Sequence, residues 1–148
     1  MANSTQYAKT VAASPSKIST TELHGRVRVA YADFTADAAQ ETINMFKLPD
    51  GARIIGGRLN HAALGSSTTV SVGHAAYTQA DGTVVALDVD EYKAAASSAS
   101  ATGSAIAATT ALGENSLVDA PDGLIVTATT SGGDATGLIT VQMTYVLD

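Results

Sequence analysis

The three histidines, His24, His61 and His74, are the first side chains to consider for catalysis or metal binding in this chain of 148 residues. A serine nucleophile needs a histidine base within hydrogen-bond reach and a third group that orients the base. Only His61 and His74 could approach each other, across a hairpin, and Asp88 or Asp90 could then complete a Zn²⁺ site. No HxH or HExxH spacing accompanies them, so hydrogen-bonded sheet histidines are the better interpretation.

Asp88, Asp90 and Glu91 form an acidic cluster that looks suited to a hard cation. The alternating acids, central Gly and final Glu of a calcium loop do not occur here. Acids at these positions also favour the first turn of a helix, so helix capping is the preferred interpretation. The pairs Gly56-Gly57 and Gly132-Gly133 match no phosphate-binding loop. We therefore predict no enzyme, no cofactor and no metal site.

Composition excludes several other classes. The chain is 45% apolar but only 5% aromatic, and it contains no Cys, which excludes disulfides, iron–sulfur clusters and thiol nucleophiles. Its length suits one domain that buries its own core without covalent staples. No apolar run approaches the roughly 18 residues of a membrane span. The net charge of -6 disfavours nucleic acid as a partner, so we predict neither membrane nor nucleic acid.

Charge is divided unevenly along the sequence. Residues 1–58 hold seven Lys and Arg against five acids, whereas residues 59–148 hold Lys93 alone against nine acids. A basic leading segment on an acidic body can bring copies of the chain together head to tail, or dock the segment on an acidic partner. An uneven but inconsequential scatter of charge is the simpler alternative.

Residues 1–25 are rich in Ser, Thr and Ala, carry Pro15 and show no sustained periodicity. This pattern predicts a flexible N-terminal arm, and it leaves residues 26–148 as a single domain. The arm lacks the basic start and apolar stretch of a signal peptide, so we expect synthesis and retention in the cytoplasm of the cell that makes it.

Alternating apolar and polar residues predict most of the remaining elements. In residues 26–34, Val27, Val29 and Tyr31 share one face, which predicts a half-buried strand. The Gly56-Gly57 pair inside the strand predicted at 53–63 indicates a bulge or a close backbone approach. Small residues at 97–111 predict a thin edge strand or a long loop. The other predicted strands are 42–48, 68–73, 83–87, 124–130 and 138–147.

Turn signals separate these strands, including Pro49-Asp50-Gly51, Asp81-Gly82 and the Gly-rich residues 131–134. Asp88 stands at an N-cap position, and residues 88–96 are the only credible helix. Seven or eight short strands with frequent turns predict an all-β fold, a β-sandwich of the jelly-roll type with one short helix.

The block at residues 46–88, FKLPDGARIIGGRLNHAALGSSTTVSVGHAAYTQADGTVVALD, resembles a pattern of small virion proteins of tailed bacteriophages, of the capsid decoration or cement type. Its features are a strand that ends in LPDGARI and a short strand TTVSVG followed by a polar loop. The resemblance implies a β-sandwich or jelly roll in which residues 48–53 form a structural turn and residues 70–73 a core strand.

The resemblance also implies a function, which is to decorate and stabilise the outside of the capsid. The expected partners are the major capsid protein and two further copies in a homotrimer, and the expected location is the virion exterior. Lys9, Lys17, Arg26 and Arg28 are the candidate capsid-contact residues of the arm. A head-fibre or tail appendage module that binds host-surface glycans is one alternative, and a tail tube or head completion protein is another.

Overall fold

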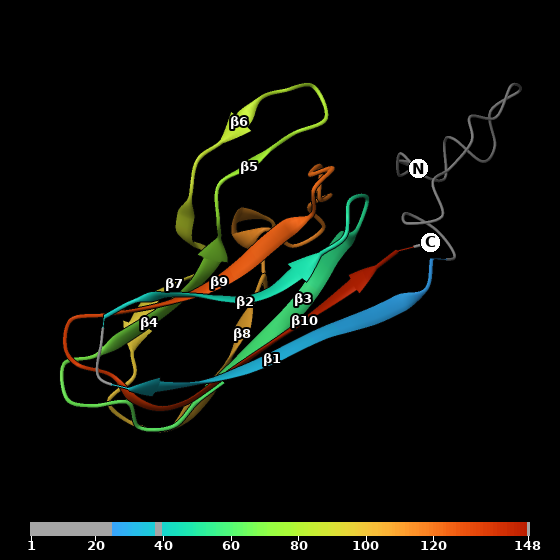
Figure 1. Cartoon of the computed structure of the whole chain (residues 1–148). Helices are drawn as coiled ribbons and strands as arrows, with labels where there is room; N and C mark the ends of the chain where they lie inside the picture. The colour runs from blue at the N-terminus through green and yellow to red at the C-terminus, as the bar shows by residue number, and fades with distance from the viewer. Residues whose placement is uncertain (1–24, 38–39, 148) are drawn as a thin grey trace, which may run out of the picture.

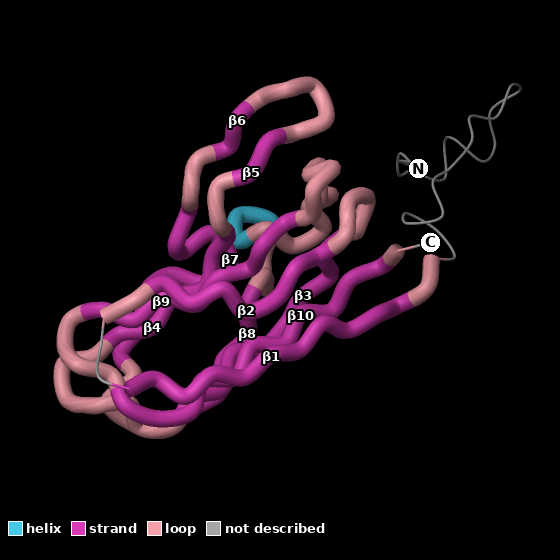
Figure 2. The backbone as a smooth tube through the Cα atoms, in the orientation of Figure 1, coloured by secondary structure: helices cyan, strands magenta, loops and turns pink. Residues whose placement is uncertain are grey.

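A computed structural model describes residues 25–37 and 40–147 of the chain. Two four-stranded antiparallel sheets pack face to face, and a small hairpin projects beyond them (Figure 1). Strands make up most of the described residues, which contain one short helical turn near the base of the hairpin (Figure 2). Within these described ranges no helix is long and apolar enough to span a membrane.

Sheet A and sheet B are named here by their strands. Sheet A has the order β1 (Val27–Asp37), β10 (Thr136–Val146), β3 (Arg53–His61) and β8 (Thr102–Ile106). Sheet B has the order β2 (Thr42–Leu48), β9 (Leu124–Ser131), β4 (Thr69–His74) and β7 (Asp88–Ser97). The projecting hairpin pairs β5 (Tyr77–Thr78) with β6 (Val84–Val85), and the helical turn is η1 (Thr110–Leu112).

The strand order is that of a jelly roll. The β5–β6 hairpin is an insertion between β4 and β7, and without it the eight main strands follow the orders 1-8-3-6 and 2-7-4-5. Consecutive main strands thus switch sheets at every connection except the one between β4 and β7, as in double-sheet jelly rolls. The predicted all-β sandwich of jelly-roll type is confirmed.

The core lies between the two sheets. Val70 and Val72 of β4 are almost fully buried, which confirms the predicted core strand. The strand predicted at 138–147 forms most of β10, and its Ile139, Val141 and Met143 are completely buried. The other large, fully buried side chains come from both sheets and their connections, and they are Leu48, Ile54, Leu59, Leu64, Ile106 and Val126.

Several local predictions are confirmed. The ladder between β10 and β3 shifts register where Thr144 and Tyr145 face residues 54–56, so the expected bulge is present. A Cβ atom on Gly57 would collide with the carbonyl oxygen of Gln142 and the side chain of Ile106, so the backbone also approaches closely there. The small residues near 102–106 form the edge strand β8.

The helix predicted at residues 88–96 is wrong, because this segment forms strand β7. Asp88 does accept a hydrogen bond from the backbone N–H of Asp90 at 3.0 Å, which is the kind of local bond that a cap makes. The backbone nevertheless pairs with β4, and Tyr92 is buried in the core. Pairing and burial outweigh the modest helix preference of the short alanine run.

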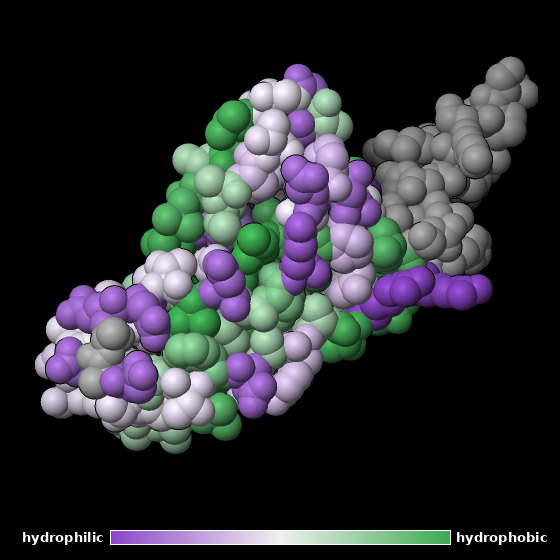
Figure 3. Space-filling model, in the orientation of Figure 1, coloured by the Kyte–Doolittle hydropathy of each residue, from purple (hydrophilic) through white to green (hydrophobic). Residues whose placement is uncertain are grey.

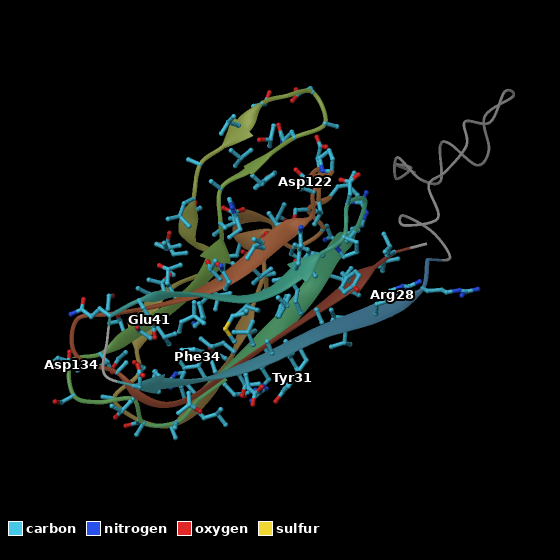
Figure 4. The ribbon with its side chains drawn as sticks, viewed as in Figure 1. Arg28, Tyr31, Phe34, Glu41, Asp122 and Asp134 are labelled. Atoms are coloured by element: carbon cyan, nitrogen blue, oxygen red, sulfur yellow. The ribbon has the colours of Figure 1, made fainter. Side chains whose placement is uncertain are left out.

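The first strand is present, but its apolar face is not the buried one. Val27, Val29 and Tyr31 are 64%, 61% and 60% exposed. The opposite face packs inward, and Phe34 lies between the sheets while Tyr31 points away from them (Figure 4). Alternation separates two faces of a strand without telling which one meets the partner sheet.

Candidate interaction surfaces

The histidines do not form a catalytic or metal site in the part of the chain that the structure describes. His61 ends β3 in sheet A, and its Nδ1 lies 2.8 Å from the carbonyl oxygen of Ala62. His74 ends β4 in sheet B, and its Nδ1 lies 2.9 Å from the carbonyl oxygen of Ala75. Each ring is held by the adjacent peptide, as expected for sheet histidines. His24 lies outside the described residues.

No cluster of three or more potential ligands that could hold a metal occurs among residues 25–37 and 40–147. Asp88 and Asp90 lie together, and the carboxylate of Asp88 accepts a hydrogen bond from the backbone N–H of Asp90. That bond holds the pKa of Asp88 below its usual value, whereas side-chain hydrogen bonding with Asp88, followed by desolvation and the Asp88 charge, raises the pKa of Asp90. The acids therefore shape the start of β7.

An aromatic cluster fixes the base of the β5–β6 hairpin. The rings of His74 and Tyr77 meet edge to face with centroids 5.3 Å apart, and the ring of Tyr92 lies 6.2 Å from His74. Burial raises the pKa of Tyr92 and of Tyr77, so both phenols stay neutral near pH 7. This packing anchors the hairpin to sheet B and so sets its direction.

The hairpin carries its own hydrogen bonds beyond this base. Gln79 N donates to Thr83 O at 2.8 Å, and Gly82 N donates to Gln79 O at 2.9 Å. The Asp81 carboxylate accepts the N–H of Thr83 at 2.8 Å, and Asp119 accepts the N–H of Ala80 at 3.1 Å. The Asp81-Gly82 turn prediction is confirmed, and the turn is ordered rather than loose.

One side of the hairpin is apolar and exposed. Val84 is 73% exposed and Leu87 is 52% exposed, and Figure 3 shows apolar surface over β6. Residues 77–91 also hold four acids and no Lys or Arg. The sequence pattern indicated a strand at 83–87, but gave no sign that its apolar side chains face solvent.

The start of β1 is a second exposed apolar surface, here called the β1 patch and defined by Val27, Val29 and Tyr31. Arg28 lies within β1 (Figure 4) and Arg26 directly precedes the strand. Both side chains are exposed. β1 is also an edge strand, because its one partner in sheet A is β10. The other two basic residues predicted to contact a capsid, Lys9 and Lys17, lie outside the described residues.

The turn at residues 48–53 is structural, as expected, and it also lines an open depression of about 410 Å³. Asp50 accepts the N–H of Ala120 at 2.8 Å, which joins this turn to the loop before β9. Gly123 and the neighbouring Pro121 and Asp122 complete the wall. The depression is open to solvent, and its titratable lining residues are Lys47, Asp50 and Asp122.

No protein-family model matches the chain, and a search of curated proteins finds no match. Solved structures do match. The chain is similar to chains of the cyanophage Pam1 capsid asymmetric unit and of the Ralstonia phage GP4 capsid, each with a TM-score of 0.63, 22% identity, and coverage of 84% of this chain and 86% of the other.

A chain of the acid-stable capsid of the Helicobacter pylori bacteriophage KHP30 matches with a TM-score of 0.57 and 18% identity, over 82% of this chain and 87% of that one. At these identities the likeness establishes the fold. The jelly roll of this chain is therefore also the fold of chains found in three bacteriophage capsid structures.

Proposed function

We propose that this chain is a structural protein of a bacteriophage virion that decorates and stabilises the outer surface of the capsid by binding the major capsid protein. The observation that carries the proposal is the jelly-roll likeness to chains of three bacteriophage capsid structures, which extends over more than 80% of both chains in each pair. The fold is thus shared at its full extent rather than through one motif.

The surfaces of the molecule support a binding role rather than catalysis. Exposed apolar side chains gather on the β1 patch and on the β5–β6 hairpin, while the described histidines bond to neighbouring peptide oxygens. Contiguous exposed apolar surface is typical of protein contact sites. A structural protein that assembles with other chains needs such surfaces.

Residues 1–25, with Lys9 and Lys17, are proposed as a clamp that orders on the capsid, and Arg26 and Arg28 extend the basic character to the start of β1. Ordering a segment loses roughly 1 to 2 kcal/mol of entropy per residue, so only part of the clamp becomes fixed. A homotrimer of sandwiches is the proposed form that meets the capsid lattice.

The copy number per virion tests the proposal. The amount of this chain in purified virions, measured by quantitative mass spectrometry against the major shell protein, should be equal to the amount of shell protein or a simple fraction of it. A handful of copies per particle would instead indicate an appendage or a connector, and absence from the virion would overturn the proposal.

Deletion of residues 1–20 tests the clamp separately. The shortened chain should fold, with an unchanged melting temperature, but should bind capsids that lack the protein more weakly than the full chain does. Unchanged occupancy of the capsid by the shortened chain would exclude a clamp in these residues.

A further inference from the structure

Two exposed surfaces of the sandwich complement each other. The β1 patch is apolar, and the exposed Arg26 and Arg28 alternate with its members on the other face of the strand start, with no acid between residues 25 and 32. The hairpin and the adjoining start of β7 present Val84 and Leu87 together with four acids and no basic residue in residues 77–91. Asp81 lies in the hairpin turn, and the other three acids lie in β7. Each surface therefore offers apolar side chains and one sign of charge, and the signs are opposite.

These surfaces lie on opposite edges of the molecule. β1 is the edge of sheet A that contacts β2, whereas the hairpin leaves sheet B between β4 and its edge strand β7 (Figure 1). A single chain cannot bring its own hairpin onto its own β1 patch, because both sheets separate them. Contact between the two surfaces requires a second copy.

We propose that the β5–β6 hairpin of one copy docks on the β1 patch of a second copy, in a head-to-tail contact. Val84 and Leu87 cover Val27 and Val29. Arg26 and Arg28 leave the other face of the strand start, and their long side chains reach around its exposed edge toward Asp81 of the turn and Asp90 of β7. A contact between two different surfaces of identical chains is heterologous, so it repeats from copy to copy, giving a ring where the rotation between copies closes and a filament where it does not.

The hairpin is suited to this role because it is ordered before binding. Its internal hydrogen bonds fix the strand pairing, in which Tyr77 lies opposite Val85 and Thr78 lies opposite Val84. Tyr77 packs inward, edge to face on His74, so the alternate residue Val84 points outward. A preorganised element loses little entropy on docking. The edge of β1 would otherwise remain an open template for pairing with other chains.

The inference concerns the purified chain, so it is tested without capsids. The oligomeric state of the full chain is measured by sedimentation velocity across a concentration series. The chain should self-associate, and the variants Arg26→Glu/Arg28→Glu and Asp81→Lys/Asp90→Lys should each weaken association about tenfold or more, because opposite charges become like charges. The matched control Asp122→Lys/Asp134→Lys reverses two exposed acids outside both surfaces and should associate like the parent chain.

The decisive variant combines all four reversals, Arg26→Glu, Arg28→Glu, Asp81→Lys and Asp90→Lys, in one chain. Head-to-tail contact then joins a basic hairpin to an acidic β1 surface, so association should return. A parent chain that stays monomeric throughout, double variants that associate normally, or a fourfold variant that stays dissociated while folded would overturn the inference.

If circular dichroism shows that the fourfold variant does not fold, variants that replace exposed apolar residues by serine test the inference instead. Val29→Ser and Val84→Ser should each shift the chain toward monomer, whereas Leu138→Ser, which removes an exposed leucine elsewhere on sheet A, should not. If the Val29→Ser, Val84→Ser and Leu138→Ser variants all associate to the same extent, the inference is overturned. Because no capsid is present, either result leaves the proposed decoration of the capsid to be judged by its own copy-number test.

Discussion

Two valine-bearing strands of this molecule, β4 and β1, have similar sequence patterns and opposite environments. Val70 and Val72 of β4 are 1% and 0% exposed, whereas Val27 and Val29 of β1 are 64% and 61% exposed. β4 lies inside sheet B between β9 and β7, and β1 is an edge of sheet A. The comparison teaches that an apolar strand can serve the core or an interface, and that its position in the sheet decides which.

The largest expected effect comes from a charge in the core strand. Val72→Asp places a carboxylate where the parent side chain is fully buried, without any polar partner expected for it. We expect a loss of about 4 kcal/mol or more, a large part of the stability of a domain of this size. Urea unfolding measures it, and a soluble variant with an unchanged midpoint would show that the assigned register of β4 is wrong.

The interior and the edge of sheet A should also differ in how much stability is lost when a glycine is replaced by alanine. A Cβ on Gly57 would meet backbone and the buried Ile106, whereas a Cβ on Gly103 would meet the ends of the flexible side chains of Asn60 and Arg58. We expect Gly57→Ala to lower the free energy of unfolding by about 2 to 3 kcal/mol. Gly103→Ala should lower it by less than about 1 kcal/mol, because those side chains can move. Equal losses in chemical denaturation would contradict this difference.

The buried Tyr92 of β7 is expected to make the stability of the protein depend on pH in the alkaline range, unlike the exposed side chains of β1. Burial raises the pKa of Tyr92 above that of an unfolded tyrosine, so its contribution to stability is complete below about pH 10 and is lost as the pH rises further. Urea midpoints between pH 8 and pH 11 should therefore fall less steeply for Tyr92→Phe than for the parent chain. The slope attributable to one group cannot exceed about 1.4 kcal/mol per pH unit.

Identical alkaline slopes for the two chains would show that Tyr92 does not couple ionisation to unfolding. Tyr31→Phe is the matched control, because Tyr31 is an exposed tyrosine on β1.

Much of the fold could be predicted from the sequence because period-two alternation and turn residues are local signals. The strands around Val70 and Val141 and the Asp81-Gly82 turn are of this kind. The β7 strand could not be predicted, because Asp88 and the alanines that follow carry a local helix preference. Its strand conformation depends on pairing with β4, a neighbour that local patterns do not identify.

The candidate surfaces could be predicted only in part. The charge division between the two halves of the sequence indicates a head-to-tail contact as one possibility, and Arg26 and Arg28 are predicted to contact the capsid. The apolar members, Val29 and Val84, could not be assigned to a surface, because apolar residues in strands are ordinarily interpreted as core. Their exposure follows from the topology of the two sheets, which is a property of the whole chain.

The smallest expected effect on stability is that of Val29→Asp, the counterpart of Val72→Asp. The side chain of Val29 is already exposed on an edge strand, so an Asp there keeps its hydration and disturbs no packing. We expect the free energy of unfolding of the monomer to change by less than about 0.5 kcal/mol, measured by urea unfolding at a concentration where the chain is monomeric. The same substitution places a negative charge opposite the acidic hairpin of a second copy, so it should abolish self-association. A loss of monomer stability close to that of Val72→Asp would mean that the β1 patch is core after all, and the contrast between the two strands would fail.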